Sequence, residues 1–399
     1  MSRSPSDRTR LIRSATKKPE HGRRPVNPPI ERASTLLNPS ISTLRDPSLG
    51  PVYAIDGMAV QHELRALIAE MEGGSDAWLT PTGLAAVTIP ILALTRPGDT
   101  VVATDAVYGP SRRFLDRYMA ARGVTTRYHP ADATTDQIVA AMDGAKLLLM
   151  ESPASLTFDM IDVPAVAAAA RDRGVLTVID NTWAAGLAFR PLAHGVDVSV
   201  QAVSKYAAGH SDLLMGAVAV ADPRLGKAIH NTIEDMGWHT APDEAWLALR
   251  GLRTLPLRLA EHARSALKVA QWLQDRPEVA RVLYPPLPGS VGHAIWSRDY
   301  AGAAGLMGVI LNGASEANAE AILDALTLFG LGYSWGGFES LATHETHQLA
   351  IRRHAATLPG PLIRLHIGLE DPDDLVADLD QALSNCPLAL TPGSDPPPA

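Results

Sequence analysis

The segment VSVQAVSKYAAGHSD, residues Val198–Asp212, is the most informative part of this chain. Its first half is an apolar run rich in valine, which predicts a buried strand, and Gly209 lies in the turn that follows. Lys205 comes just past the end of the predicted strand. Sheets covered by helices on both faces bind ligands at the carboxyl ends of their strands, so Lys205 is a candidate site residue. A surface lysine that happens to follow a strand is the alternative.

A carboxylate ends the preceding predicted strand. The segment LTVIDNTWAAG, Leu176–Gly186, places Asp180 at that strand end. An isolated aspartate there is usually a turn or capping residue. A lysine and an aspartate at neighbouring strand ends, however, match the needs of pyridoxal phosphate (PLP), which takes an amine for a Schiff base and an anion that keeps its pyridine nitrogen protonated. The pair Lys205 and Asp180 therefore predicts a PLP site.

Short β-branched runs alternate with longer Ala-rich segments on both sides of this region. The predicted strands are Thr100–Thr104, Thr125–Tyr128, Lys146–Met150, Leu176–Ile179, Val198–Ala202 and Ala217–Val220. The predicted helices are Leu64–Met71, Ser111–Arg122, Thr135–Met142 and Val163–Arg173. This alternation predicts an α/β fold whose parallel or mixed sheet is covered on both faces.

The pattern changes near Gly251, which predicts a second domain of α+β type. A long helix over Leu255–Asp275 leads to three further strands, Val279–Leu283, Met307–Leu311 and Leu362–Ile367. We therefore divide the chain into a disordered basic arm (1–29), an N-terminal arm (30–62), a PLP-binding domain (63–252), a C-terminal domain (253–385) and a flexible tail (386–399). An organellar transit peptide is the alternative for the basic arm, which holds eight Lys and Arg against two acidic residues.

Composition excludes several classes of partner. The net charge of −8 over 399 residues disfavours nucleic acid and anionic membranes. The longest apolar run, Ala85–Leu94, contains Pro90 and is shorter than the ~20 residues that cross a bilayer. The single cysteine, Cys386, indicates a reducing compartment such as the cytoplasm. His344 and His347 are spaced like metal ligands but have no third ligand at a recognised spacing, so no metal site is predicted.

Seven motifs in one order resemble the Cys/Met-metabolism PLP-dependent enzymes, and most closely the bacterial cystathionine β-lyases. They are EMEGG (70–74), ESPASLTFD (151–159), IDNTWAAG (179–186), SKYAAGHSD (204–212), GLRTL (251–255), YSWGGFESL (333–341) and LIRLHIGLED (362–371). The resemblance runs from Ala33 to Leu383. It implies an aspartate-aminotransferase-like fold (PLP fold type I) and a homotetramer built from dimers, in which residues 30–62 contact the neighbouring subunit.

The resemblance also implies roles for individual residues. Lys205 is the Schiff-base lysine and proton shuttle, and Asp180 is the partner of the pyridine nitrogen. Tyr108 stacks on the cofactor ring. Gly83 and Leu84 offer backbone N–H groups at a helix N-terminus to the phosphate, which suits an anion on general grounds.

The remaining implied roles concern the phosphate and the substrate. Ser204 adds a hydroxyl to the phosphate site, and Tyr53 reaches it from the neighbouring subunit. Arg364 binds the substrate α-carboxylate, for which a planar bidentate guanidinium is suited. A structural ion pair is the alternative for that arginine. Ser334 and Trp335 line the substrate pocket.

The sequence departs from the family at one place. Members usually have a Tyr-x-Arg element that holds the phosphate of the neighbouring subunit, and the corresponding stretch here reads VYAIDGMAV. Tyr53 is present, but Ile55 replaces the arginine and Asp56 follows. Losing a cation beside a phosphate dianion weakens the site. Either another basic group compensates, such as Arg45, or the site is reshaped for a different substrate.

The resemblance implies carbon–sulfur β-elimination. The expected reaction converts L-cystathionine or a related cysteine thioether into a thiol (homocysteine from cystathionine), pyruvate and ammonia. Trp335 favours it over cystathionine γ-lyase or γ-synthase activity, because γ-acting relatives typically lack this tryptophan. The departure at Ile55 leaves open a repurposed lyase that acts on another cysteine conjugate. Lys205, Asp180 and Arg364 argue against a catalytically silent scaffold.

Overall fold

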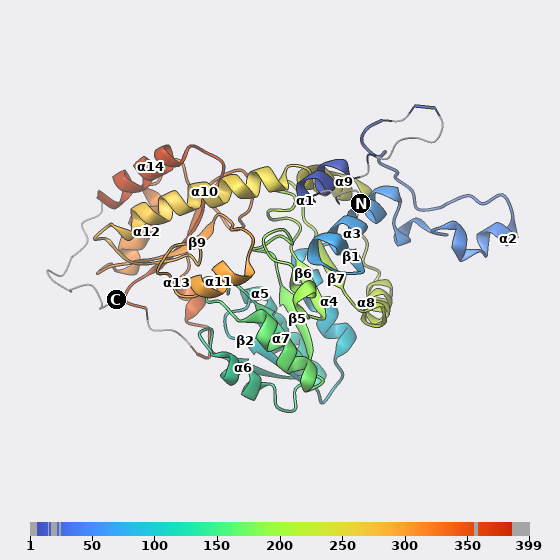
Figure 1. Ribbon diagram of the computed structural model, residues 1–399, viewed down its shortest axis with the longest axis horizontal. Coiled ribbons are helices and arrows are strands. Elements are labelled where there is room, and N and C mark those ends of the chain that lie inside the picture. The colour runs from blue at the N-terminus through green and yellow to red at the C-terminus, as the bar shows by residue number, and fades with distance from the viewer. Residues whose placement is uncertain (1–5, 15, 17–21, 24, 355–357, 385–399) are drawn as a thin grey trace, which may run out of the picture.

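The computed structural model describes residues 6–14, 16, 22–23, 25–354 and 358–384, and it contains two sheets (Figure 1). The larger sheet has the strand order β1-β7-β6-β5-β4-β2-β3. Its strands are β1 (Asp76–Thr80), β2 (Thr100–Thr104), β3 (Thr125–His129), β4 (Leu147–Glu151), β5 (Leu176–Asp180), β6 (Val198–Gln201) and β7 (Gly216–Val220). The neighbouring strands β3, β2, β4, β5 and β6 run parallel to one another, whereas β7 is antiparallel to both β6 and β1. The predicted mixed, mostly parallel sheet is thereby confirmed.

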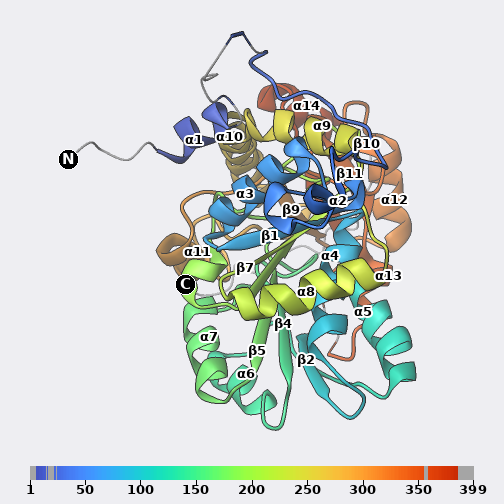
Figure 2. The ribbon, with the colours of Figure 1, turned by 90° about the vertical axis from the view of Figure 1, so that its right-hand side faces the viewer.

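Alternate residues of β1, β2, β4, β5 and β7 enter two separate apolar cores. On β2, Val101 and Ala103 pack in the core that α4 (Gly83–Leu94) and α8 (Pro223–Asp235) complete. Val102 points the other way, into the core that contains residues of α3 (Ala59–Glu72) and α7 (Val163–Asp172). Figure 2 shows α8 lying across one face of the sheet. Further helices are α5 (Gly109–Arg113), α6 (Thr135–Ala141) and α9 (Pro242–Leu252).

The smaller sheet belongs to the C-terminal part of the chain and has the order β10-β11-β12-β9-β8. Its strands are β8 (Val279–Leu283), β9 (Leu306–Leu311), β10 (Gly330–Leu331), β11 (Leu341–His344) and β12 (Leu362–His366). The surrounding helices are α10 (Leu255–Gln274), α11 (His293–Asp299), α12 (Glu316–Asp324), α13 (Thr346–Leu349) and α14 (Pro372–Ser384). The long helix α10 connects the two parts (Figure 1). Within the described residues, no helix is long and apolar enough to cross a membrane.

The start of the chain differs from its prediction. Asp7–Arg13 form the helix α1, so the expected disorder of residues 1–29 is wrong for this segment. The side chain of Leu11 is buried, with 1% of it exposed. Asp7 pairs with Arg190 at 2.6 Å, and Arg10 Nε lies 2.7 Å from Glu70 Oε1. One buried leucine and two ion pairs to the body therefore dock a segment whose composition indicates disorder. The predicted tail, 386–399, lies outside the described residues.

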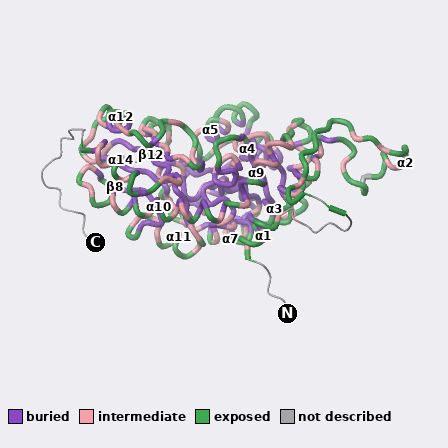
Figure 3. Tube along the Cα trace, turned by 90° about the horizontal axis from the view of Figure 1, so that it is seen from above, coloured by how far each residue is buried: buried purple, intermediate pink, exposed green. Residues whose placement is uncertain are grey.

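Residues 25–57 form an arm that extends away from the body. Its base is attached by the Trp246 indole N–H, which donates to Pro28 O at 3.2 Å, and by the ion pair between Arg32 and Asp243. Beyond the base, α2 (Ile41–Leu44) projects to one side, and the tube in Figure 3 is mostly exposed there. Large apolar side chains of the arm are open to solvent, including Val26, Leu37 (96% exposed), Ile41, Leu49 and Val52.

A buried carboxylate ties the end of α3 to two neighbouring strands. Glu72 is 1% exposed and accepts hydrogen bonds from Asn181 Nδ2 at 2.8 Å, Ser199 Oγ at 2.8 Å and Gln201 Nε2 at 2.7 Å. Ser199 and Gln201 lie on β6, and Asn181 directly follows β5. Burial raises the pKa of Glu72 to about 7, against the hydrogen bonds that lower it. This network fixes the carboxyl ends of β5 and β6 relative to each other.

We expect Glu72 to make stability depend on pH. Its pKa is about 7 in the fold and 4.5 as an unperturbed group, so the folded chain binds more protons between these values. Stability therefore falls as pH rises through that window, by up to about 3 kcal/mol from this group. Urea unfolding of wild type and Glu72→Gln at pH 5 and pH 7.5 measures the effect. The free energy of unfolding should fall more between the two pH values in wild type than in the variant. Identical pH dependence in the two proteins would contradict it.

Candidate active site

A cavity of about 1170 Å³ opens at the carboxyl ends of β4, β5 and β6, where residues of the smaller domain close it from the other side. It brings together most of the side chains that the sequence singled out. Its lining includes Gly83, Leu84, Tyr108, Asp180, Ser204, Lys205, Ser334, Trp335 and Arg364. Residues of four separate motifs thus converge on one space.

Lys205 lies in the turn after β6, with its amine directed at a loop of the smaller domain. Its Nζ donates to Ser334 Oγ at 2.5 Å and lies 5.3 Å from the centroid of the Trp335 ring. Burial, and after it the nearby charge of Arg364, lower the pKa of Lys205 to about 8 against the opposing charge of Asp180. At pH 7 about a tenth of this lysine is therefore the free amine, its nucleophilic and basic form, far more than for an ordinary lysine of pKa 10.5.

Asp180 is the last residue of β5 and is oriented by the chain that follows it. Its Oδ1 accepts from Thr182 N at 3.0 Å and from Thr182 Oγ1 at 2.5 Å. Burial raises the pKa of Asp180, whereas the two bonds from Thr182 and the charge of Lys205 lower it. Thr182 Oγ1 also accepts from Ala202 N at 2.9 Å, so this hydroxyl links the end of β5 to the end of β6.

Tyr108 lies at the start of α5 with 48% of its surface exposed toward the cavity. Its backbone N–H donates to Glu151 Oε2 at 2.7 Å. Glu151 ends β4 and pairs in register with Asp180 on β5. Burial and the neighbouring Asp180 raise the pKa of Glu151 well above its usual range. The sequence analysis did not identify Glu151 as a site residue. The signal was available, because Glu151 ends β4 in the same way that Asp180 ends β5.

The N-terminus of α4 faces the same space. The first N–H groups of a helix have no carbonyl partner within it, so those of Gly83 and Leu84 are available to an anion. A Cβ atom at Gly83 would lie 2.4 Å from the Cβ of Ala202, so glycine allows α4 to approach the end of β6. The Ser204 hydroxyl donates to Met215 O at 3.1 Å and accepts from Met215 N at 2.9 Å. Its proton is thus already used by the backbone.

Arg364 is held on β12 at the other side of the cavity. Its Nη1 lies 3.3 Å from Glu345 Oε1, and its Nη2 donates weakly to Ser334 O at 3.4 Å. Burial lowers the pKa of Arg364, and Glu345, which is fully buried, opposes that shift. Arg364 also lines the cavity. Both the predicted carboxylate contact and the alternative structural ion pair are therefore compatible with its position.

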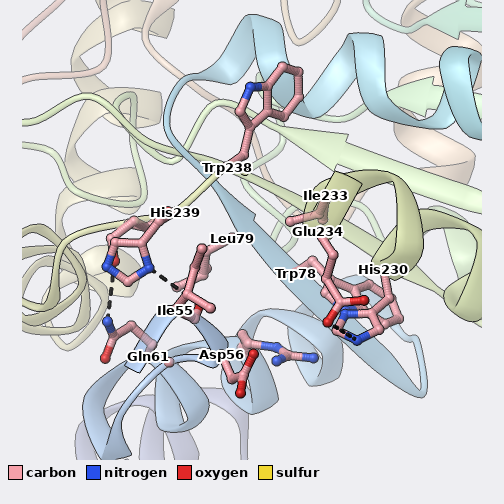
Figure 4. Close-up of a pocket in the computed structure, with 13 residues that line it drawn as sticks. Ile55, Asp56, Gln61, Trp78, Leu79, His230, Ile233, Glu234, Trp238 and His239 are labelled. Atoms are coloured by element: carbon pink, nitrogen blue, oxygen red, sulfur yellow. Dashed lines mark hydrogen bonds and ion pairs between the residues drawn. The ribbon is translucent and has the colours of Figure 1, made fainter. Parts of the chain in front are cut away.

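Tyr53 does not line this cavity. It lies on the arm, where 50% of it is exposed, and Ile55 is 44% exposed nearby. Ile55 and Asp56 instead line a second, smaller pocket of about 190 Å³ together with residues of α3, β1 and α8 (Figure 4). In that pocket His239 Nδ1 lies 3.4 Å from Ile55 O. Within one chain the arm therefore contributes nothing to the space around Lys205.

The structure holds no metal-binding cluster among the residues it describes. No group of three or more His, Cys, Asp or Glu side chains there could hold a metal ion. His344 Nε2 is within 2.9 Å of Thr346 Oγ1, and its Nδ1 lies 3.8 Å from Glu320. This histidine has partners that explain its position without a metal.

The fold and the cavity define a PLP-dependent enzyme of fold type I. The family model described as "Cys/Met metabolism PLP-dependent enzyme" matches residues 8–384, and the chain belongs to this family. It is 41% identical over 378 residues to the cystathionine β-lyase of Bordetella avium, which covers 93% of this chain and 95% of that protein. It is 42% identical over 368 residues to the cystathionine β-lyase of Escherichia coli (strain K12), with 89% and 92% covered.

Solved structures agree with the fold. A crystal structure of cystathionine γ-synthase from Xanthomonas oryzae pv. oryzae in complex with cystathionine matches with a TM-score of 0.87 and 31% identity. The match covers 96% of this chain and 98% of that chain. The chain is thus similar to β-lyases in sequence and to a γ-synthase in structure, so the fold alone does not separate the two activities.

We expect Gly336 to be required for the close contact between its loop and the backbone of Lys205 and Tyr206. Its φ is +87°, and a Cβ there would lie 2.7 Å from Tyr206 N and 2.9 Å from Lys205 C. Gly336→Ala should therefore lower both stability and cofactor content. Gly289→Ala is the control, because its φ is +81° but nothing lies within 4 Å, so it should cost only about 1 kcal/mol. Urea unfolding and cofactor stoichiometry measure both variants, and equal effects would contradict the expectation.

We also expect the pKa of Lys205 to be visible in cofactor uptake. Only the free amine attacks pyridoxal phosphate, so the rate of uptake by apo-protein should rise with pH and level off above about 8 rather than above 10.5. Stopped-flow absorbance from pH 6 to 10 gives this midpoint. Lys205→Ala is the control and should retain no cofactor after borohydride reduction. Reducible attachment in that variant would show that another lysine holds the cofactor.

Proposed function

We propose that this chain is a PLP-dependent carbon–sulfur β-lyase that cleaves L-cystathionine or a related cysteine thioether to a thiol, pyruvate and ammonia. One observation carries the proposal: the Lys205 amine, Asp180 and Arg364 converge on a single cavity beside Trp335. The identity of about two residues in five to cystathionine β-lyases over nine-tenths of the chain supports the same reaction.

The residues around the cavity fit pyridoxal phosphate. Lys205 supplies an amine of lowered pKa, Asp180 an oriented carboxylate, and the start of α4 two N–H groups for the phosphate, with Gly83 leaving room beside Ala202. Tyr108 lines the same cavity and would cover the ring face. When bound, the cofactor supplies an electron sink that acidifies the substrate Cα–H bond. Asp180 supports that property because a carboxylate there favours a protonated pyridine nitrogen.

Lys205 carries the proton in this proposal. Its free Nζ accepts the Cα proton of the substrate, since the amine is partly desolvated and its pKa of about 8 lies close to neutral pH. The electron pair left on Cα then forms a Cα–Cβ double bond as the bond between Cβ and sulfur breaks with its own electron pair leaving on sulfur. The 2-aminoacrylate that is released adds water and loses ammonia to give pyruvate. The protonated Nζ, or the Tyr108 hydroxyl, delivers a proton to the departing thiolate.

The substrate is held from the smaller domain. Arg364 binds the α-carboxylate, and the buried Glu345 behind it fixes the direction of the guanidinium. Ser334 contacts Nζ of Lys205, and Trp335 forms an apolar wall beside the same amine. Trp335 is also the residue by which this sequence resembles the β-acting rather than the γ-acting members of the family.

We further propose a homotetramer made of dimers, with residues 30–62 contacting the neighbouring subunit and Tyr53 serving that subunit's site. The support is the row of exposed apolar side chains on the arm, such as Leu37 at 96% exposure, which a monomer would leave in water. The division into domains at residues 63, 253 and 386 remains part of the proposal, as does a cytoplasmic location.

A panel of thioethers tests the proposed reaction. Wild-type holoenzyme should release pyruvate from L-cystathionine, and Lys205→Ala should lower kcat by at least ~100-fold because a positioned general base is lost. Release of 2-oxobutyrate instead would establish γ-cleavage. Pyruvate from another cysteine thioether but not from cystathionine would establish a repurposed lyase, in line with Ile55 and Asp56. Turnover of no amino acid in the panel would refute the proposal.

A further inference from the structure

The loop between β10 and β11 has a strained conformation where it meets Lys205. Ser334 has φ +90°, a backbone conformation that residues other than glycine seldom adopt, and Gly336 follows with φ +87°. This backbone delivers the Ser334 hydroxyl to Nζ of Lys205 at 2.5 Å. Such a conformation persists only where neighbouring groups hold it, so the contacts of the loop matter for the position of Ser334.

One of these contacts is a buried histidine on β12. The backbone N–H of Gly336 donates to His366 Nε2 at 3.1 Å, and the same ring nitrogen lies 3.2 Å from Gly337 O. A single imidazole nitrogen either accepts or donates, so only one of the two contacts is a hydrogen bond at a time. His366 is 1% exposed and lies two residues beyond Arg364, on the same face of the strand.

A second buried histidine lies beside His366. His262 Nδ1 lies 2.8 Å from Ile367 O, and because a carbonyl only accepts, Nδ1 carries the proton and Nε2 has a lone pair. The two rings are 5.2 Å apart, and His262 Nε2 and His366 Nδ1 are both buried with no hydrogen-bond partner among the described residues. The Gly336 N–H can only donate, so its bond to His366 requires a lone pair on Nε2 and places the proton of His366 on Nδ1.

The surroundings keep this imidazole uncharged. Burial, together with His262, Arg364 and Lys205, lowers the pKa of His366 to about 3 against the opposing effect of the Gly337 backbone. The ring packs against Tyr206, which follows Lys205 in the chain, with centroids 5.7 Å apart. His366 thus touches both the loop that carries Ser334 and the turn that carries Lys205, without a titration of its own near neutral pH.

We propose that His366 is a positioning residue for the reaction, which accepts the Gly336 N–H and so holds Ser334 against Lys205 and Trp335 beside it. The inference rests on the proposed role of Lys205 and deepens it by naming what orients the loop of the smaller domain. A purely space-filling role for His366 is the competing explanation, and it makes no use of the Nε2 lone pair.

The experiment compares three variants of the full chain as holoenzyme. His366→Gln keeps an acceptor near the position of Nε2, and His366→Leu removes it. His293→Leu is the matched control, because His293 is a histidine of the same domain that contacts a carbonyl, Pro285 O, at 2.8 Å, outside the cavity lining. Amide hydrogen exchange over residues 333–340, kcat, KM and the thermal midpoint are measured for each.

The expected result separates hydrogen bonding from packing. His366→Leu should lose protection over residues 333–340 and lower kcat by about 100-fold, the loss typical of a displacement of ~1 Å at a reacting centre. His366→Gln should keep the protection and stay within about fivefold of wild-type kcat, and His293→Leu should leave both unchanged. Unchanged loop protection in His366→Leu, or equal losses in the Gln and Leu variants, would overturn the inference. The exchange measurement tests the loop even if cystathionine proves not to be the substrate.

Discussion

Placing an ammonium and a carboxylate together in a desolvated cavity is the constraint on which this structure depends. Burial disfavours the charged forms of both Lys205 and Asp180, and each is partly stabilised by the other. Their mutual attraction falls with distance, so the two strand ends must stay in a fixed relation. Thr182 supplies part of that relation on the cavity side by bonding both Asp180 and the backbone of Ala202.

The second half of the site comes from a different sheet. Arg364 and His366 project from β12 toward the loop that carries Ser334 and Trp335, and that loop in turn touches Lys205. The proposed site thus lies between the two sheets, and neither sheet contains it alone. In the proposed reaction, substrate binding and proton transfer belong to opposite walls, and the loop with Ser334 joins the two because it contacts both Arg364 and Lys205.

The sequence predicted most of the larger sheet because its strands have strong, local apolar patterns. Thr100–Thr104 was placed without error, and Lys205 and Asp180 were found because polar residues at strand ends are conspicuous in apolar surroundings. Long-range pairings were not accessible in this way. The bond from Gly336 to His366 joins residues 30 positions apart, and α1 was missed because Leu11 is its single buried residue in a segment otherwise rich in charge. Only tertiary packing makes either feature stable.

The Glu72 network has a consequence for how this chain tolerates change. Asn181, Ser199 and Gln201 all donate to one buried carboxylate, so substituting any of them removes a partner of that carboxylate, and substituting Glu72 removes an acceptor from all three. Once one partner is lost, losing the next costs less, which makes the four positions strongly epistatic. Homologues should therefore replace these four residues as a group or not at all. Sequence change around β5 and β6 is thus restricted even at side chains that do not reach the cavity.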